Sequence, residues 1–161
     1  MSIVIFPPFT VHSESVEHVC SEYLFGFKYY NWEEAEQHCN RRNYDGLVSM
    51  QTDGEWVYFK NIATNITPEL SPEQQTALEK GRWFIGLRYL SHNLWCWSND
   101  TKACINQATN DTGNWRWHNK EPNNLRDEHC VEMHKSGKYN NIKCTERFSY
   151  IGFICEKKVG M

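Results

Sequence analysis

Seven cysteines constrain this chain more than any other feature of its sequence. They lie far apart and include no CxxC pair: Cys20, Cys39, Cys96, Cys104, Cys130, Cys144 and Cys155. Zinc modules usually bring cysteines in closely spaced pairs, whereas cysteines scattered over a small domain are typical of a disulfide framework. Because disulfides persist in oxidising compartments, the pattern predicts an extracellular protein, either secreted or the ectodomain of a membrane protein.

Length and composition exclude several other classes of protein. A chain of 161 residues suffices for one compact domain, and its 14% of aromatic residues favour a folded core over disorder. The net charge of -3 and the scattered Lys and Arg residues offer no basic surface, so we expect no nucleic acid partner. No apolar run could span a membrane, and the opening "IVIF" is too short for a secretory signal. We therefore expect one module of a longer protein, with no membrane insertion within this chain.

Two helices are predicted from their start signals. Residues 31–42 begin with Asn31 as cap and Glu34 three positions later, the arrangement of a capping box. Thr52 and Glu55 repeat the same signal at the start of residues 52–63. Both segments then carry apolar residues at helical spacing.

The remaining patterns are those of strands and loops. We expect strands over 23–30, with a turn or bulge at Gly26, and over 46–50, 82–90, 130–135, 139–144 and 150–157. Residues 98–120 are predicted to form a long polar loop, residues 1–19 a leader or linker, and 64–81 an insertion within a domain spanning 20–158. Two helices followed by a mostly antiparallel sheet indicate an α+β fold.

The ordered set of these segments resembles one family, the C-type lectin-like domains. The matching segments are "WEEAEQHC", "LVSM", "WFIGL", "LWCWSND" and "EPNN…EHCVEM…YNNIKC…FICEK". They follow the family's order over roughly residues 20 to 157. The resemblance implies the C-type lectin fold, stapled by disulfides and carrying a long polar binding loop, and a binding module in place of an enzyme.

The resemblance also implies two disulfides, Cys39 with Cys155 and Cys130 with Cys144. Cys96 and Cys104 are not part of that shared set, and their spacing of eight favours a local bridge. This leaves Cys20, which is predicted either to link to an upstream segment or a second chain, or to take Cys104 and free Cys96.

A calcium site follows from the same resemblance, in the stretch "WHNKEPNNLRDEHCVEM". Family members carrying Glu-Pro-Asn have a cis proline there and bind calcium through that triplet, which corresponds here to Glu121 and Asn123. Glu128, two residues before a cysteine, matches the third ligand, and Asn140 and Asn141 match a Trp-Asn-Asp motif. Asn141 stands where the family has Asp, so the anionic ligands fall from three to two. Ligand charge is a main determinant of calcium affinity, and we expect a weakened site.

The implied ligand is a carbohydrate. Glu121, Asn123, Glu128 and Asn140 would bond the sugar hydroxyls that ligate the calcium, and the order Glu-Pro-Asn resembles the mannose, fucose and N-acetylglucosamine type. The alternative is a protein-binding domain of the same fold that binds neither calcium nor sugar, with a glycoprotein or protein as its ligand.

Two further predictions concern the surface. Sequons at Asn65, Asn99 and Asn110 fit N-glycosylation of an extracellular chain. Of the five later tryptophans, Trp83, Trp95 and Trp97 are predicted to be core, while Trp115 or Trp117, beside the loop, has a smaller chance of contacting a partner.

Overall fold

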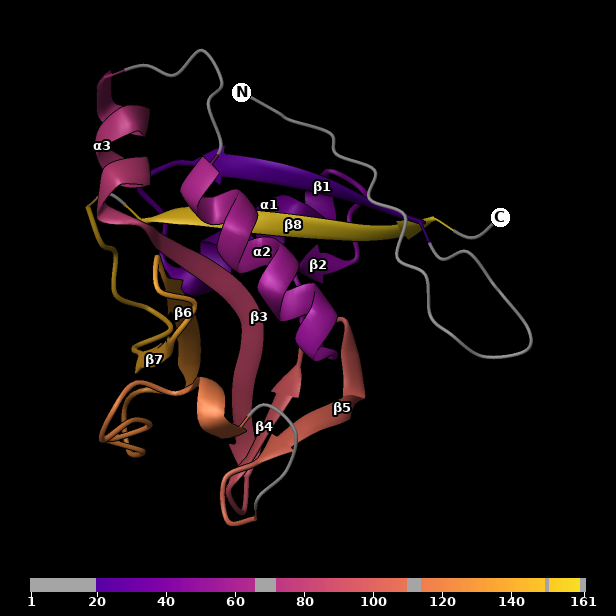
Figure 1. Ribbon diagram of the computed structural model, residues 1–161, viewed down its shortest axis with the longest axis vertical. Coiled ribbons are helices and arrows are strands. Elements are labelled where there is room, and N and C mark those ends of the chain that lie inside the picture. The colour runs from indigo at the N-terminus through magenta and orange to yellow at the C-terminus, as the bar shows by residue number, and fades with distance from the viewer. Residues whose placement is uncertain (1–19, 66–71, 110–113, 150, 160–161) are drawn as a thin grey trace.

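The structure is a computed structural model that describes residues 20–65, 72–109, 114–149 and 151–159. A long antiparallel strand pair crosses one end of the molecule, and a third long strand leads from it to the strands at the other end (Figure 1). In the described part, no helix is both long and apolar enough to cross a membrane.

The described residues form three α-helices. The first, α1 (Trp32–Arg41), starts with the predicted capping box of Asn31 and Glu34, and its inner face is buried. The second, α2 (Asp53–Asn65), is capped by Thr52, whose hydroxyl oxygen accepts a hydrogen bond from the Glu55 N–H. The third, α3 (Pro72–Lys80), lies in the predicted insertion.

Within the part of the chain that the structure describes, eight strands make one sheet, in the order β1-β8-β3-β4-β5, with β2 pairing β8 and β6 pairing β3 and β7. Their bounds are β1 Cys20–Phe27, β2 Gly46–Leu47, β3 Arg82–Ser91, β4 Leu94–Trp97, β5 Asp100–Asn106, β6 Cys130–His134, β7 Tyr139–Ile142 and β8 Gly152–Val159. Among the strand pairs of the described sheet, β3 and β8 alone run parallel, so the mostly antiparallel α+β fold is confirmed.

The turn or bulge predicted at Gly26 is wrong. Strand β1 pairs with β8 in an unbroken register from Cys20 opposite Val159 to Phe27 opposite Gly152. A Cβ on Gly26 would lie 2.0 Å from the Phe153 ring. The glycine therefore provides room for that ring and does not bend the strand.

The prediction of a continuous loop over 98–120 is also wrong in its first part. Strand β5 pairs with β4 there, and the Cys96–Cys104 disulfide joins the two strands. Ile105 is buried while Thr101 and Lys102 face solvent, so most of the segment has the polar character of an edge strand. A 3-10 turn, η1 (Asn114–Arg116), leads into the remaining loop.

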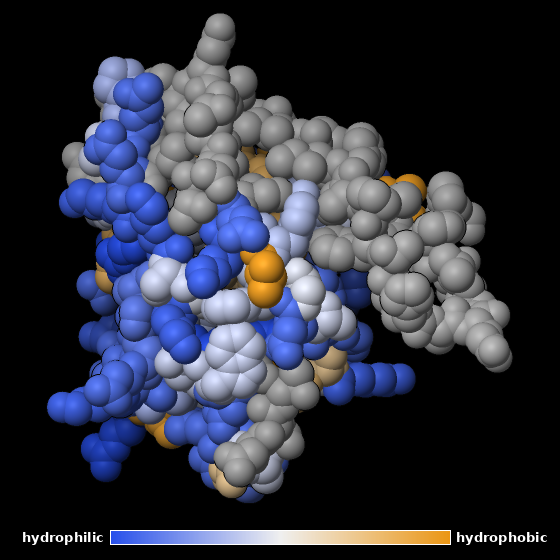
Figure 2. All heavy atoms as spheres, in the orientation of Figure 1, coloured by the Kyte–Doolittle hydropathy of each residue, from blue (hydrophilic) through white to orange (hydrophobic). Residues whose placement is uncertain are grey.

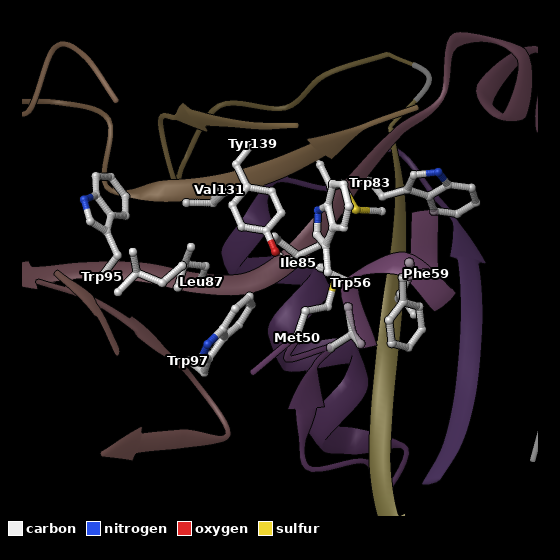
Figure 3. Packing of buried hydrophobic residues seen from close by; sticks show 14 of the residues in the cluster. Met50, Trp56, Phe59, Trp83, Ile85, Leu87, Trp95, Trp97, Val131 and Tyr139 are labelled. Atoms are coloured by element: carbon white, nitrogen blue, oxygen red, sulfur yellow. Dashed lines mark hydrogen bonds between the residues drawn. The ribbon is translucent and has the colours of Figure 1, made fainter. Parts of the chain in front are cut away.

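The main core is rich in aromatic residues from both helical and strand segments. Figure 3 shows Trp56 and Tyr139 facing the β3 residues Ile85 and Leu87. Trp83, Trp95 and Trp97 are buried as predicted, and so is Trp117, whereas Trp115 keeps 48% of its surface exposed. Aromatic side chains supply much of the apolar area that such a core removes from water.

Three disulfides brace this fold: Cys39–Cys155, Cys96–Cys104 and Cys130–Cys144. All three expected bridges are thus confirmed, and the alternative pairing of Cys20 with Cys104 is wrong. A link from Cys20 to another chain or segment stays a prediction.

Candidate functional site

The five predicted ligand residues come together around one cavity of ≈ 280 Å³. Glu121, Asn123 and Glu128 reach it from the loop between η1 and β6, whereas Asn140 and Asn141 reach it from β7. The β6–β7 hairpin and the Cys130–Cys144 disulfide hold the loop's end against β7. Residues separated by up to 20 positions therefore share one small polar site.

The Glu-Pro-Asn triplet presents oxygen atoms to this cavity. Its Glu121–Pro122 peptide bond is cis. The Asn123 side-chain nitrogen donates to Oε1 of Glu121 at 2.8 Å, so the amide oxygen is left as an acceptor. Oε2 of Glu121 is buried and has no hydrogen-bond partner among the described residues. Burial raises the pKa of Glu121, and the neighbouring Glu128 carboxylate raises it further.

Asn141 holds the loop from within. Its buried side-chain nitrogen donates to the backbone carbonyls of Asn123 and Glu128, the latter at 2.9 Å. Its oxygen accepts from the Asn123 N–H at 3.0 Å. One amide thus closes three hydrogen bonds across the loop, and we call this arrangement the Asn141 clasp. An amide can do this because it carries both donors and an acceptor, whereas a carboxylate only accepts.

Asn140 is positioned by an ionic cluster around the buried Glu132 carboxylate, and no local pattern in the sequence indicates this cluster. Its side-chain nitrogen donates to Oε1 of Glu132 at 3.2 Å. Arg82 binds the same carboxylate through two hydrogen bonds of 2.9 Å, and His134 contacts it at 2.9 Å. These contacts hold the pKa of Glu132 below its ordinary value although burial opposes this. This cluster positions the Asn140 amide, whose oxygen accepts no hydrogen bond from the described residues.

The cavity extends beyond the predicted residues. Arg82, Lys143, Glu146 and Phe148 also line it, and the Arg82 guanidinium lies 5.1 Å from the centre of the Phe148 ring. Arg82 opens β3, some forty residues before the loop, and no spacing signal in the sequence joins it to the site. On the face shown in Figure 2, the described surface is largely hydrophilic.

The sequons have different surroundings. Asn110 lies outside the described residues, and Asn65 ends α2. The side-chain nitrogen of Asn99, where a glycan would attach, is buried in the turn between β4 and β5. Attachment at Asn99 would therefore need this turn to open, and glycosylation of the three sites stays a prediction.

Comparison with known proteins assigns the family. The sequence model of the lectin C-type domain matches residues 28–157. Mouse L-selectin is 31% identical over 134 residues, which cover 80% of this chain and 30% of the selectin. Horse E-selectin is 28% identical over 121 residues, covering 72% of this chain and 16% of the relative. The chain thus spans less than a third of the length of these curated relatives.

Solved structures share the fold at low identity. The C-type carbohydrate-recognition domain of cow CD23, crystallised with a GlcNAc2Man3 oligosaccharide, superposes with a TM-score of 0.61 at 22% identity over 88% of this chain and 90% of that one. A calcium-independent type II antifreeze protein superposes with a TM-score of 0.59 at 18% identity over 98% of both chains. With its fold, its disulfides and the match over residues 28–157, this chain belongs to the lectin C-type domain family.

Proposed function

We propose that this domain is an extracellular, calcium-dependent carbohydrate-binding module of the mannose, fucose and N-acetylglucosamine type, with weakened calcium affinity. The observation that carries the proposal is the convergence of Glu121, Asn123, Glu128 and Asn140 on one cavity, where Oε2 of Glu121 has no hydrogen-bond partner in the described part of the chain. A buried, unpartnered carboxylate oxygen costs free energy, and a bound cation would remove that cost.

The residues present fit calcium. This ion takes six to eight oxygen ligands from carboxylates, amides and water. Glu121 and Glu128 would supply the charge, and the amide oxygens of Asn123 and Asn140 face no donor within the described chain. Among the described residues, no three His, Cys, Asp or Glu side chains form a metal cluster, so the amides would be essential.

Asn141 fits less well than the other four residues. Its oxygen already accepts the Asn123 N–H, so only its second lone pair is available to an ion. We therefore propose that Asn141 chiefly shapes the loop, and that two carboxylates carry the anionic part of the site. This lower ligand charge is the reason for the weakened affinity.

The chain's own side chains would orient the sugar. When bound, calcium supplies a centre that two neighbouring sugar hydroxyls can ligate. The same four residues then bond those hydroxyls: the carboxylates accept from them, and the amides of Asn123 and Asn140 can either donate or accept. The pairing of Asn123 with Glu121 at 2.8 Å sets these two groups before any ligand arrives.

A calcium titration followed by protein melting tests the proposal. An ion that binds only the folded domain raises the melting temperature as its concentration exceeds Kd. We expect a rise at millimolar calcium, lost in Glu121→Gln and kept in Glu146→Gln, which changes the same charge on the same cavity. Calcium-dependent retention on immobilised mannose, and not on galactose, would then establish the sugar type. The absence of any calcium-induced rise refutes the proposal.

One observation favours the second candidate, a protein-binding domain without calcium. The Asn141 clasp closes the loop with protein hydrogen bonds alone, so an ion is not needed to order it. The candidate predicts equal melting with calcium and with chelator, and capture of a protein ligand under both conditions.

A further inference from the structure

Arg82 forms part of the wall of the candidate calcium cavity, beside Asn140. The Arg82 Nη2 and the Asn140 side-chain nitrogen both donate to Oε1 of Glu132, at 2.9 Å and 3.2 Å. The two nitrogens are therefore no farther apart than the sum of these distances. The guanidinium carbon of Arg82 also lies 5.1 Å from the centre of the Phe148 ring, which lines the same cavity. The part of Arg82 next to these lining residues is thus its guanidinium and not its aliphatic stem.

Glu132 holds this guanidinium in one orientation. The Nε and Nη2 atoms of Arg82 each donate to the carboxylate at 2.9 Å, and the Glu132 side chain is only 1% exposed. Such a two-pronged contact fixes the plane of the group, and the Phe148 ring adds a cation–π attraction. A guanidinium that is already fixed loses little conformational entropy when it makes one more hydrogen bond. Arg82 is therefore preorganised for contact with a ligand.

The third nitrogen of the group, Nη1, has no acceptor among the described residues. The Arg82 side chain keeps 30% of its surface exposed. Nη1 is not among the buried polar atoms that lack a partner in the described chain, which agrees with an accessible position. Because Nε and Nη2 face the buried Glu132, Nη1 is the nitrogen of Arg82 that remains for a molecule in the cavity.

The charges around Arg82 favour a neutral acceptor over an anion. The buried Glu132 carboxylate offsets the guanidinium charge at 2.8 Å. Lys143 is the other cation among the described lining residues, whereas three carboxylates line the cavity, those of Glu121, Glu128 and Glu146. An anion would meet this excess of negative charge, but a hydroxyl is uncharged and accepts through its oxygen.

We propose that Arg82 is a specificity-determining residue, which donates from Nη1 to a hydroxyl on the second unit of a neutral oligosaccharide. The contact rests on the proposed function, because the first sugar unit has to be held by the residues of the calcium site. Those residues take the two hydroxyls that ligate calcium, and the cavity continues from Asn140 to Arg82 and Phe148. A second unit, linked to the first, would lie against this part of the wall. The added hydrogen bond then distinguishes a disaccharide from a single sugar.

The experiment compares one sugar unit with two in the presence of calcium. Calorimetry measures the affinities of methyl α-mannoside and of the α-linked mannobioses for the whole chain. We expect at least one mannobiose to bind roughly three- to tenfold more tightly than the monosaccharide, the gain from one added hydrogen bond. If no sugar binds, the proposed function fails, and the Arg82 contact fails with it. If the monosaccharide binds and no mannobiose binds more tightly, the Arg82 contact alone is refuted.

A matched pair of substitutions separates a direct contact from support of Asn140. Arg82→Lys keeps a cation beside Glu132, but one nitrogen replaces three, so the ratio of disaccharide to monosaccharide affinity should fall to about one. Loss of support for Asn140 would weaken the binding of both sugars and leave this ratio unchanged. Arg147→Lys is the same substitution in an arginine that bonds Glu34 and does not line the cavity, so it should keep the ratio. A ratio that Arg82→Lys keeps, or that both variants lose equally, overturns the proposal.

A second measurement requires no variant. Analogues of the tighter mannobiose, each lacking one hydroxyl of the second unit, are titrated against the parent. Removing the hydroxyl that accepts from Nη1 should reduce the affinity to that of methyl α-mannoside, whereas the other deletions should have little effect. If every analogue binds as tightly as mannobiose, no hydroxyl of the second unit accepts from Arg82, and the proposal is overturned.

Discussion

Replacing Asn141 with Asp should destabilise the calcium-free domain and should increase the stabilisation that calcium provides. The variant keeps the size of the side chain but removes the two hydrogen bonds that the Asn141 nitrogen donates to Asn123 and Glu128. It also sets a carboxylate against two backbone carbonyls at a position that is 1% exposed. The clasp would then keep only the bond from the Asn123 N–H.

The magnitude follows from the groups left unpaired. Removing the partner of a buried polar group costs roughly 1–3 kcal/mol, so losing both donors should destabilise the calcium-free domain by roughly 2–4 kcal/mol. For a domain of this size, that corresponds to a fall in melting temperature on the order of 10 °C. Calcium would supply the missing positive charge, and at a hundredfold excess over Kd it restores about 2.7 kcal/mol.

The assay is a pair of melting curves, in chelator and in millimolar calcium. We expect the variant to melt below the parent in chelator and to show the larger calcium-induced rise, since a third carboxylate increases calcium affinity. Asn119→Asp places the same charge at an exposed position of the same loop and should change neither curve much. If the variant matches the parent in chelator, the clasp does not stabilise the loop. If its rise is no larger than the parent's, ligand charge does not limit the site.

Three further predictions rest on single groups. Burial raises the pKa of Glu156 to about 7, so the contribution of its protonated form to the free energy of unfolding is complete below pH 4.5 and is lost as the pH rises through 7. In urea denaturation, the free energy of unfolding of Glu156→Gln relative to the parent should therefore increase by roughly 3 kcal/mol between pH 5 and 8. Parallel pH profiles of the two proteins would contradict this. Because the pKa of Glu121 is raised, acidification should weaken calcium binding at a higher pH than it would for a site with an ordinary carboxylate. Equal calcium affinities at pH 7.5 and 5.5, measured by calorimetry, would refute this prediction. Gly26→Ala should destabilise the domain by roughly 1–3 kcal/mol against the Phe153 ring, which unchanged urea midpoints would disprove.

Local signals predicted much of the fold. Asn31 with Glu34 and Thr52 with Glu55 mark helix starts through contacts within four residues, and both caps form. Strand β5 was missed because an edge strand with one buried side resembles a polar loop in sequence.

The sequence predicted which residues form the candidate site but not the hydrogen bonds between them. Spacing within the family motif brings Asn141 to the cavity, but the direction of its amide depends on loop carbonyls that only the folded chain places. Likewise, Arg82 meets Glu132 because β3 pairs with β6, a register that no local pattern in the sequence encodes.

The Cys39–Cys155 disulfide also determines how the domain would respond to mechanical tension. Cys20 and Val159 are paired at one end of β1 and β8, so a force pulling them apart would unzip the two strands one residue pair at a time. After the last residues of β8 peel away, the load reaches Cys155 and passes through the covalent bond to Cys39. Every described residue that lines the candidate calcium cavity lies between these two cysteines in the chain. Tension along the backbone would therefore bypass them, and binding could persist while the ends of the domain are stretched.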